Sequence, residues 1–417
     1  MGKKLLISAV AIIGMLIGIV FAKTAKICQT NEVFHNIKSE HAPERSSGGY
    51  LLVPDPNFGK KVYLVNENGL VVKTWHTSIV PNHRMLDDQG NLWVGTHKCG
   101  LLKISTICIM TEIQKIAWDG TVLKTYKYPR VHHDFEPLKN GGLALLALKE
   151  LGPEEAKKIQ GGIPYCSPER QVDQFIVELD ERGDVVWTWS FQSALQVYKL
   201  PNNQINCEIF HPNSIRYIES NPIDGDPAYL ISARHISLVF MVNRRTGEVI
   251  WRSPENTHIY QHDARLADTG NVVLFSNREG IEHFRNNPDN QEYFKKIPAD
   301  DLYRWVQQFP RSVIIELDPK TNQIAWSYPG EAFQRPIKAA SFFNSFSSGV
   351  FPLKNGSVLI TESTNGQIRE VTRDKKVVFR AVVSGPMAPD KVQKYFPEST
   401  HLPLSATSRI KQRLCSF

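Results

Sequence analysis

Short runs of alternating apolar and polar residues, each broken by a polar turn, recur along most of the chain. Six of these runs share one form: a β-rich stretch, a turn with Asp, Asn or Gly, and a second β-rich stretch that often ends in tryptophan. They begin at Val62, Gln114, Phe175, Val239, Val313 and Gln367. Alternation on both sides of a short turn predicts a β-hairpin.

A second recurring sequence pattern lies between the hairpins: a leucine, a short polar turn with glycine, and an apolar strand. It begins at Leu86, Leu138, Leu266 and Leu353. Each unit therefore holds about four strands. Six such units predict an all-β fold, a six-bladed β-propeller of four-stranded blades. We expect it to span residues 48–385, with the stretch from Gly48 as the innermost strand of the first blade.

Other parts of the chain lack the repeat. Insertions interrupt it at 150–172, 191–207 and 280–310, and the last two are expected to contain short helices. The C-terminal tail over 386–417 has lost the pattern and is expected to pack on the outside of the ring or to extend from it.

The N-terminus carries an uninterrupted run of uncharged residues over 5–22, preceded by two lysines. A helix of this length nearly covers the hydrocarbon core of a bilayer. We expect a transmembrane anchor over residues 1–26, followed by a linker over 27–47, with the lysines on the cytoplasmic side. The alternative is a cleaved signal peptide, for which Ala22 and Ala25 offer small residues near a cleavage site. In the anchored form the protein is single-pass, with the propeller on the periplasmic (extracytoplasmic) side of the membrane.

Charge and cysteine content exclude some functions. The net charge of +7 is spread along the chain without a Lys/Arg block, so no nucleic-acid partner is expected. The six cysteines lack CxxC spacing, which argues against a zinc-finger site. In an exported protein disulfides can form, and Cys166 with Cys207 is the first candidate pair.

Histidines stand just before the innermost strand in successive units. They are His83, His132, His133, His211 and His262, whereas the sixth unit has Ser347 and Ser348 near this place. In a propeller the starts of the innermost strands surround the axis at one mouth. We therefore expect these side chains to converge there, with Asp134 and Asp263 as orienting or turn-forming neighbours. Arg234 and His235 end the strand after His211 and could reach the same mouth.

The residue types leave more than one chemistry open. A neutral imidazole can act as a nucleophile or a base, and a guanidinium matches the oxygens of a sulfate. Three histidines such as His133, His211 and His262 can also bind zinc or a similar ion. A third possibility is a non-enzymatic extracellular scaffold whose propeller face binds a partner. The residue types alone do not separate these alternatives.

Four sequence motifs resemble those of a known protein family. HHD at His132, HPNS at His211, SARHIS at Arg234 and QHDA at His262 occur in this order and resemble the arylsulfotransferase family of propeller enzymes. The resemblance covers roughly residues 48–380.

The resemblance implies transfer of a sulfuryl group from an aryl sulfate to a phenol through a sulfohistidine, without a nucleotide donor, metal or other cofactor. It implies that His262 is the nucleophile and that His211 and Arg234 bind the sulfuryl oxygens. It also implies that His133 assists the leaving or entering phenol oxygen. We expect His132, His235 and His83 to contribute to substrate binding.

Overall fold

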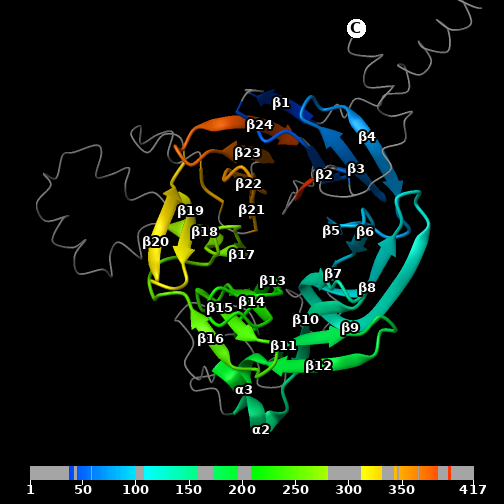
Figure 1. The fold of residues 1–417 in the computed structure, drawn as a ribbon. Coiled ribbons are helices and arrows are strands. Elements are labelled where there is room, and N and C mark those ends of the chain that lie inside the picture. The colour runs from blue at the N-terminus through cyan, green and yellow to red at the C-terminus, as the bar shows by residue number, and fades with distance from the viewer. Residues whose placement is uncertain are drawn as a thin grey trace, which may run out of the picture.

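The chain forms a ring of small antiparallel sheets around a common axis, as the computed structural model shows (Figure 1). The structure describes residues 37–41, 45–57, 59–99, 108–157, 172–195, 208–279, 311–330, 342–344, 347–364, 366–383 and 393–395. Within these residues the helices α2 (Pro153–Ala156) and α3 (Phe191–Leu195) are single short turns. The predicted all-β class is confirmed, and α3 lies where a short helix was expected.

Six blades make up the described ring. Three sheets have four strands, one has five, and one has eight strands that hold two blades. The two blades share the long strand β9 (Val122–Pro137), whose first half pairs with β8 and whose second half pairs with β10. A single strand thus serves as the outer edge of one blade and the inner edge of the next.

The first blade, from the axis outward, is β25 (Gln393–Tyr395), β2 (Tyr50–Pro54), β3 (Lys61–Asn66) and β4 (Val71–His76). The second is β5 (His83–Leu86), β6 (Leu92–Gly95), β8 (Cys108–Ile116) and the first half of β9, with β7 (Lys98–Cys99) paired to β8. The third is the second half of β9, β10 (Leu143–Glu150), β11 (Val172–Leu179) and β12 (Val185–Ser190).

The fourth blade is β13 (Pro212–Ile218), β14 (Ala228–Ala233), β15 (Leu238–Asn243) and β16 (Val249–Arg252). The fifth is β17 (His262–Leu266), β18 (Val272–Glu279), β19 (Arg311–Asp318) and β20 (Gln323–Tyr328). The sixth is β21 (Gly349–Pro352), β22 (Val358–Glu362), β23 (Gln367–Val371) and β24 (Val377–Val383), with β1 (Ile37–His41) added outside β24.

The ring extends past the predicted boundaries at both ends. β1 lies in the predicted linker and pairs with β24, and β25 lies in the predicted tail and pairs with β2. The stretch from Gly48 therefore forms the second strand of its blade, because β25 takes the innermost place. Pairing of an N-terminal and a C-terminal segment into the ring protects strand edges that would otherwise be exposed.

The tryptophans that end the repeated hairpins join neighbouring blades. Each indole Nε1 donates a hydrogen bond to the hairpin turn of the next blade. The pairs are Trp75 to Ala117 O at 3.2 Å, Trp189 to Gly247 O at 2.8 Å, Trp251 to Asn322 Oδ1 at 2.8 Å and Trp326 to Arg373 O at 2.9 Å. This repeated contact explains why the outer strand so often carries Trp, which buries a large ring and still satisfies its N–H.

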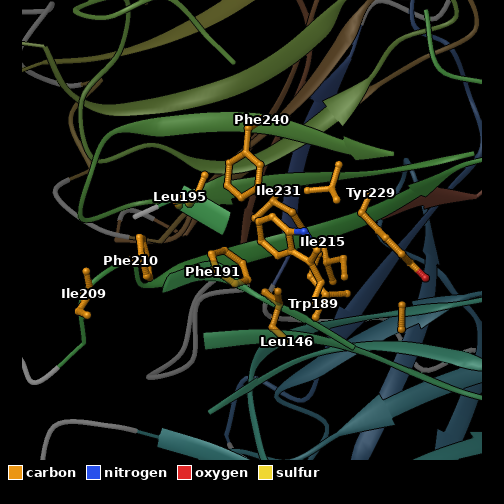
Figure 2. Close-up of a cluster of buried hydrophobic side chains, with 14 of the residues drawn as sticks. Leu146, Trp189, Phe191, Leu195, Ile209, Phe210, Ile215, Tyr229, Ile231 and Phe240 are labelled. Atoms are coloured by element: carbon orange, nitrogen blue, oxygen red, sulfur yellow. The ribbon is translucent and has the colours of Figure 1, made fainter. Parts of the chain in front are cut away.

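An aromatic cluster fills the space between the third and fourth blades (Figure 2). Trp189 and Phe191 from the third blade pack against Phe240 from the fourth. Phe191 also contacts Phe210, which is fully buried and directly precedes His211. The start of β13 is thereby held by close-packed side chains, which fixes the backbone that positions His211.

Several predictions fall outside the described residues: the anchor over 1–26, the 280–310 insertion, and the Cys166–Cys207 pair. Within the described residues, no helix is long and apolar enough to span a bilayer. Cys108 takes part in a disulfide.

Candidate functional site

The innermost strands of three consecutive blades begin with a distorted backbone. His133, His211 and Asp263 have φ values of 60°, 49° and 49°. The strand register shifts at the same places, in the β10–β9, β13–β14 and β17–β18 pairs. Bulges of this kind bend a strand and redirect its side chains, and they are frequent beside active sites.

Four histidines and one glutamate come together at these strand starts, and we call His132, His133, His211, His235 and Glu208 the histidine cluster. The Nε2 atoms of His133 and His211 lie 2.8 Å apart, a distance that requires a shared proton. His235 stacks on His211 with ring centroids 4.5 Å apart. The predicted convergence of histidines from the third and fourth blades is therefore present.

The Glu208 carboxylate holds two of these imidazoles. Nδ1 of His211 donates to Oε2 at 2.5 Å, and Nε2 of His132 lies 3.3 Å from Oε1. Burial alone would raise the pKa of Glu208, but the two imidazoles outweigh it and hold that pKa well below the usual value. The carboxylate is therefore ionised and accepts both N–H groups.

His133, His211 and His235 are neutral near physiological pH. Burial lowers the pKa of His133 well below its usual value, and the neighbouring imidazoles add to the effect. Burial likewise lowers the pKa of His211, although Glu208 opposes it, and brings the pKa of His235 to about 3. Neutral imidazoles can accept protons or offer a lone pair.

His262 lies on the next blade and has hydrogen-bond partners at both ring nitrogens. Nδ1 lies 2.6 Å from Oδ1 of Asn277, and Nε2 lies 3.2 Å from the backbone N–H of Ser347. The amide nitrogen of Asn277 donates to the carbonyls of Asn344 and Ser347, both at 2.9 Å, so its oxygen faces His262. His262 therefore carries its proton on Nδ1, and its Nε2 lone pair accepts the N–H of Ser347.

Arg234 contacts both the histidine cluster and Tyr260, which lies near His262 in the sequence. Its backbone N–H donates to the carbonyl of His211 at 3.1 Å. Its guanidinium lies over the ring of Tyr260, two residues before His262, at 5.0 Å from the centroid. It is close enough to His211 and His235 to contribute to their lowered pKa values. It brings a positive charge beside the histidine cluster.

A buried ion network ties the three inner strands together. Nη1 of Arg216 donates to Asp134 and Nη2 donates to Asp263, both at 2.8 Å. Burial lowers the pKa of Arg216, but the surrounding carboxylates raise it by more, so the guanidinium is charged. Arg216 thus fixes Asp134, which directly follows His133, and Asp263, which directly follows His262. The two carboxylates do more than shape turns.

His83 was expected at the substrate site, and the structure gives it a different set of contacts. Its Nε2 lies 2.8 Å from Oδ1 of Asp134. Its ring packs edge-on against Phe135 with centroids 4.6 Å apart. His83 therefore joins the second blade to the buried ion network.

Three site residues were missed by sequence reasoning: Glu208, Arg216 and Asn277. Glu208 stands three residues before His211, and Arg216 interrupts an otherwise apolar strand. A charged residue inside an apolar strand is a signal of a buried partner. Asn277 has no comparable signal, because its role depends on the carbonyls of Asn344 and Ser347 lying against β18.

The family comparison agrees with the four motifs. The model for the family described as Arylsulfotransferase (ASST) matches residues 108–384, more than half of the chain. The chain belongs to the arylsulfotransferase family. All four motifs lie inside the matched region, and the family supports a sulfotransferase-like enzyme.

Likenesses to solved structures are distant. A protein of unknown function from Bacteroides caccae has a TM-score of 0.44 and 12% identity, with 83% of this chain and 98% of that chain covered. A streptogramin B lyase structure gives 0.42 and 12%, with 84% and 88% covered. The WD40 β-propeller domain of Doa1 gives 0.36 and 11%, with 82% and 95% covered. None of the curated proteins compared with this chain matches it. The propeller assignment therefore rests on the strand order.

Proposed function

We propose that this arylsulfotransferase moves a sulfuryl group from an aryl sulfate to a phenol through a sulfohistidine at His262, without a nucleotide donor. The observation that carries the proposal is the hydrogen bonding of His262. Asn277 holds the proton on Nδ1, so the lone pair is at Nε2, the form in which a histidine attacks. Membership of the family supports the general reaction.

In the first half-reaction the Nε2 lone pair gives up its hydrogen bond from Ser347 N–H and attacks the sulfur atom, and the bond from sulfur to the aryl oxygen breaks. The aryl group leaves as aryloxide, and the sulfuryl group remains on Nε2. The imidazole becomes positively charged, and Asn277 Oδ1 stabilises that charge by accepting the Nδ1–H bond. Arg234 supplies the positive charge for the sulfuryl oxygens.

In the second half-reaction the acceptor phenol attacks the same sulfur and the nitrogen–sulfur bond breaks. The hydroxyl proton of the phenol must move to a base. His133 and His211 suit this role, because their lowered pKa values leave them neutral and Glu208 stabilises the cation that forms. The proton then passes to the released aryloxide or to solvent, which restores the starting state.

Phenol-dependent release of nitrophenol tests the reaction. The purified full chain is incubated with para-nitrophenyl sulfate, with and without phenol, in the absence of any nucleotide. We expect release that depends on phenol and produces phenyl sulfate in equal amount. Release without phenol sulfation would indicate a sulfatase, and no release with a panel of aryl sulfates and phenols would refute the proposal.

Asn277 can be tested as the residue that orients His262. Leucine at this position removes both the acceptor for Nδ1–H and the donor to the carbonyls, and we expect Asn277→Leu to lower kcat by about 10²- to 10⁴-fold. Asn277→Asp loses the same donor but keeps an acceptor, so it should retain much more activity than the leucine variant. Equal kcat for both variants would assign Asn277 a purely structural role.

We also propose a membrane-anchored, single-pass arrangement with the propeller on the extracytoplasmic side, motivated by the uncharged run over 5–22. Alkaline extraction of membranes tests it. An anchored chain stays in the membrane fraction, and a soluble chain shortened at its N-terminus would refute the anchor.

A further inference from the structure

The histidine cluster has the composition of a metal site as well as of a proton-transfer group. One imidazole nitrogen from each of His132, His133 and His211 lies within 4.8 Å of the other two. In the described part of the chain the group contains His132 and not His262, whose two nitrogens bond Asn277 and Ser347. The ligand set expected from sequence, with His262 as a member, therefore differs from the one that the structure brings together.

The hydrogen bonding of the cluster matches that of metal-binding histidines. Such histidines almost always donate their second ring N–H to a carboxylate or carbonyl, which fixes the tautomer and the ring orientation. Here the Glu208 carboxylate accepts from Nδ1 of His211 and faces Nε2 of His132 at 3.3 Å. One buried carboxylate thus orients two of the three rings and directs Nε2 of His211, which bonds only His133 Nε2, and Nδ1 of His132 away from itself as ligand atoms.

His132 provides a second, independent observation. Its side chain is 1% exposed, and its Nδ1 atom is buried without a hydrogen-bond partner among the described residues. Because Nε2 donates to Glu208, this Nδ1 carries an unused lone pair. A buried acceptor without a partner destabilises the fold unless a ligand uses it.

We infer that His132, His133 and His211 bind a divalent first-row transition-metal ion, with Zn²⁺ as the representative. Three histidine ligands and one open coordination position are a common arrangement for such ions. Glu208 balances part of the charge that the nearby Arg234 adds. The His211 side chain is 15% exposed, so water or a ligand oxygen can reach the open position.

The ligand atoms need only a small movement. Without an ion the Nε2 atoms of His133 and His211 share a proton at 2.8 Å. Around Zn²⁺, with metal–nitrogen distances of about 2.0–2.1 Å, tetrahedral geometry places two nitrogens about 3.4 Å apart. For these two ligands, moving the proton of His133 from Nε2 to Nδ1 and slightly opening the pair is enough. The His132 nitrogen, which lies within 4.8 Å of both, must move closer.

This inference does not rest on the proposed reaction. An ion at this position would use lone pairs that the proposed reaction employs as a base, so binding and transfer must be measured separately. Binding is read directly from the metal, and nitrophenol release is measured on metal-free protein. If zinc binding is not observed, nitrophenol release can still be interpreted, and the reverse also holds.

Zinc titration of the purified full chain tests the site. After removal of metal by a chelator, calorimetric titration with Zn²⁺ should show one equivalent bound per chain and a raised Tm. Glu208→Gln should weaken binding by about 10- to 100-fold. His132→Ala should weaken it at least as much. The control is His76→Ala, an exposed histidine on β4, which should bind like the parent protein.

Two results would overturn the site. One is a parent protein that binds no stoichiometric Zn²⁺, and the other is equal binding by the parent and by His132→Ala. Cooperative thermal unfolding of the metal-free variants serves as the folding check. If His132→Ala fails this check, Glu208→Gln decides, because it keeps the size of the side chain and removes only the charge.

Discussion

Replacing His262 with alanine should lower phenol-dependent release from para-nitrophenyl sulfate by about 10⁴-fold or more, the scale seen when a covalent nucleophile is removed. Nothing else among the described residues offers the same arrangement at this place, with a proton fixed on Nδ1 by Asn277 and a lone pair at Nε2. The initial rate of nitrophenol formation measures the effect. Added imidazole should restore part of the rate by taking the place of the missing ring.

The matched control is again His76→Ala, which removes an exposed imidazole from an outer strand. It should transfer sulfuryl groups like the parent protein. A folded His262→Ala variant that stays within a few-fold of the parent rate would contradict the assignment of His262, whatever the activity of the control.

Replacing Arg216 with methionine should lower the free energy of unfolding by about 3–5 kcal/mol, the range for breaking a buried ion pair from one side. Arg216 is buried and holds Asp134 and Asp263, which are themselves buried. Without the guanidinium both carboxylates lose their main charged partner inside the ring. Denaturant unfolding followed by circular dichroism measures the change, and transfer activity should fall with it because the strands that carry His133 and His262 lose their link.

Arg245→Met is the control for Arg216. Arg245 pairs with Asp226 at 2.9 Å, but its side chain is 69% exposed. Exposed pairs contribute about 0–1 kcal/mol, so this variant should unfold almost like the parent protein. Equal losses in both variants would show that the Arg216 network contributes no more to stability than an exposed ion pair.

The blades could be predicted from the sequence because each is a local repeat. Alternation around a turn is a property of a few consecutive residues, and the tryptophan at the end of a hairpin, such as Trp189, recurs because it bonds the next blade. The closing strands could not be predicted. β1 and β25 are short and pair with segments far away in the sequence, so their existence depends on the ring being formed.

The candidate site could be predicted only in part, for a similar reason. His133, His211 and His262 stand at equivalent places in successive repeats, and that equivalence is visible in the sequence. The identity of each partner depends on contacts between blades. His132 belongs to the cluster because it pairs with Glu208, whereas His262 bonds Asn277 instead. These contacts join residues far apart in the sequence, so no local sequence pattern predicts them.

Trapping the sulfuryl group on the protein tests the sulfohistidine at His262. The full chain is mixed with para-nitrophenyl sulfate in the absence of a phenol acceptor, quenched under alkaline conditions, digested and analysed by mass spectrometry. We expect one added SO₃ group, located on His262, and its disappearance when phenol is supplied. No adduct on a transfer-competent enzyme, or an adduct on another residue that phenol removes at the rate of transfer, would refute the intermediate.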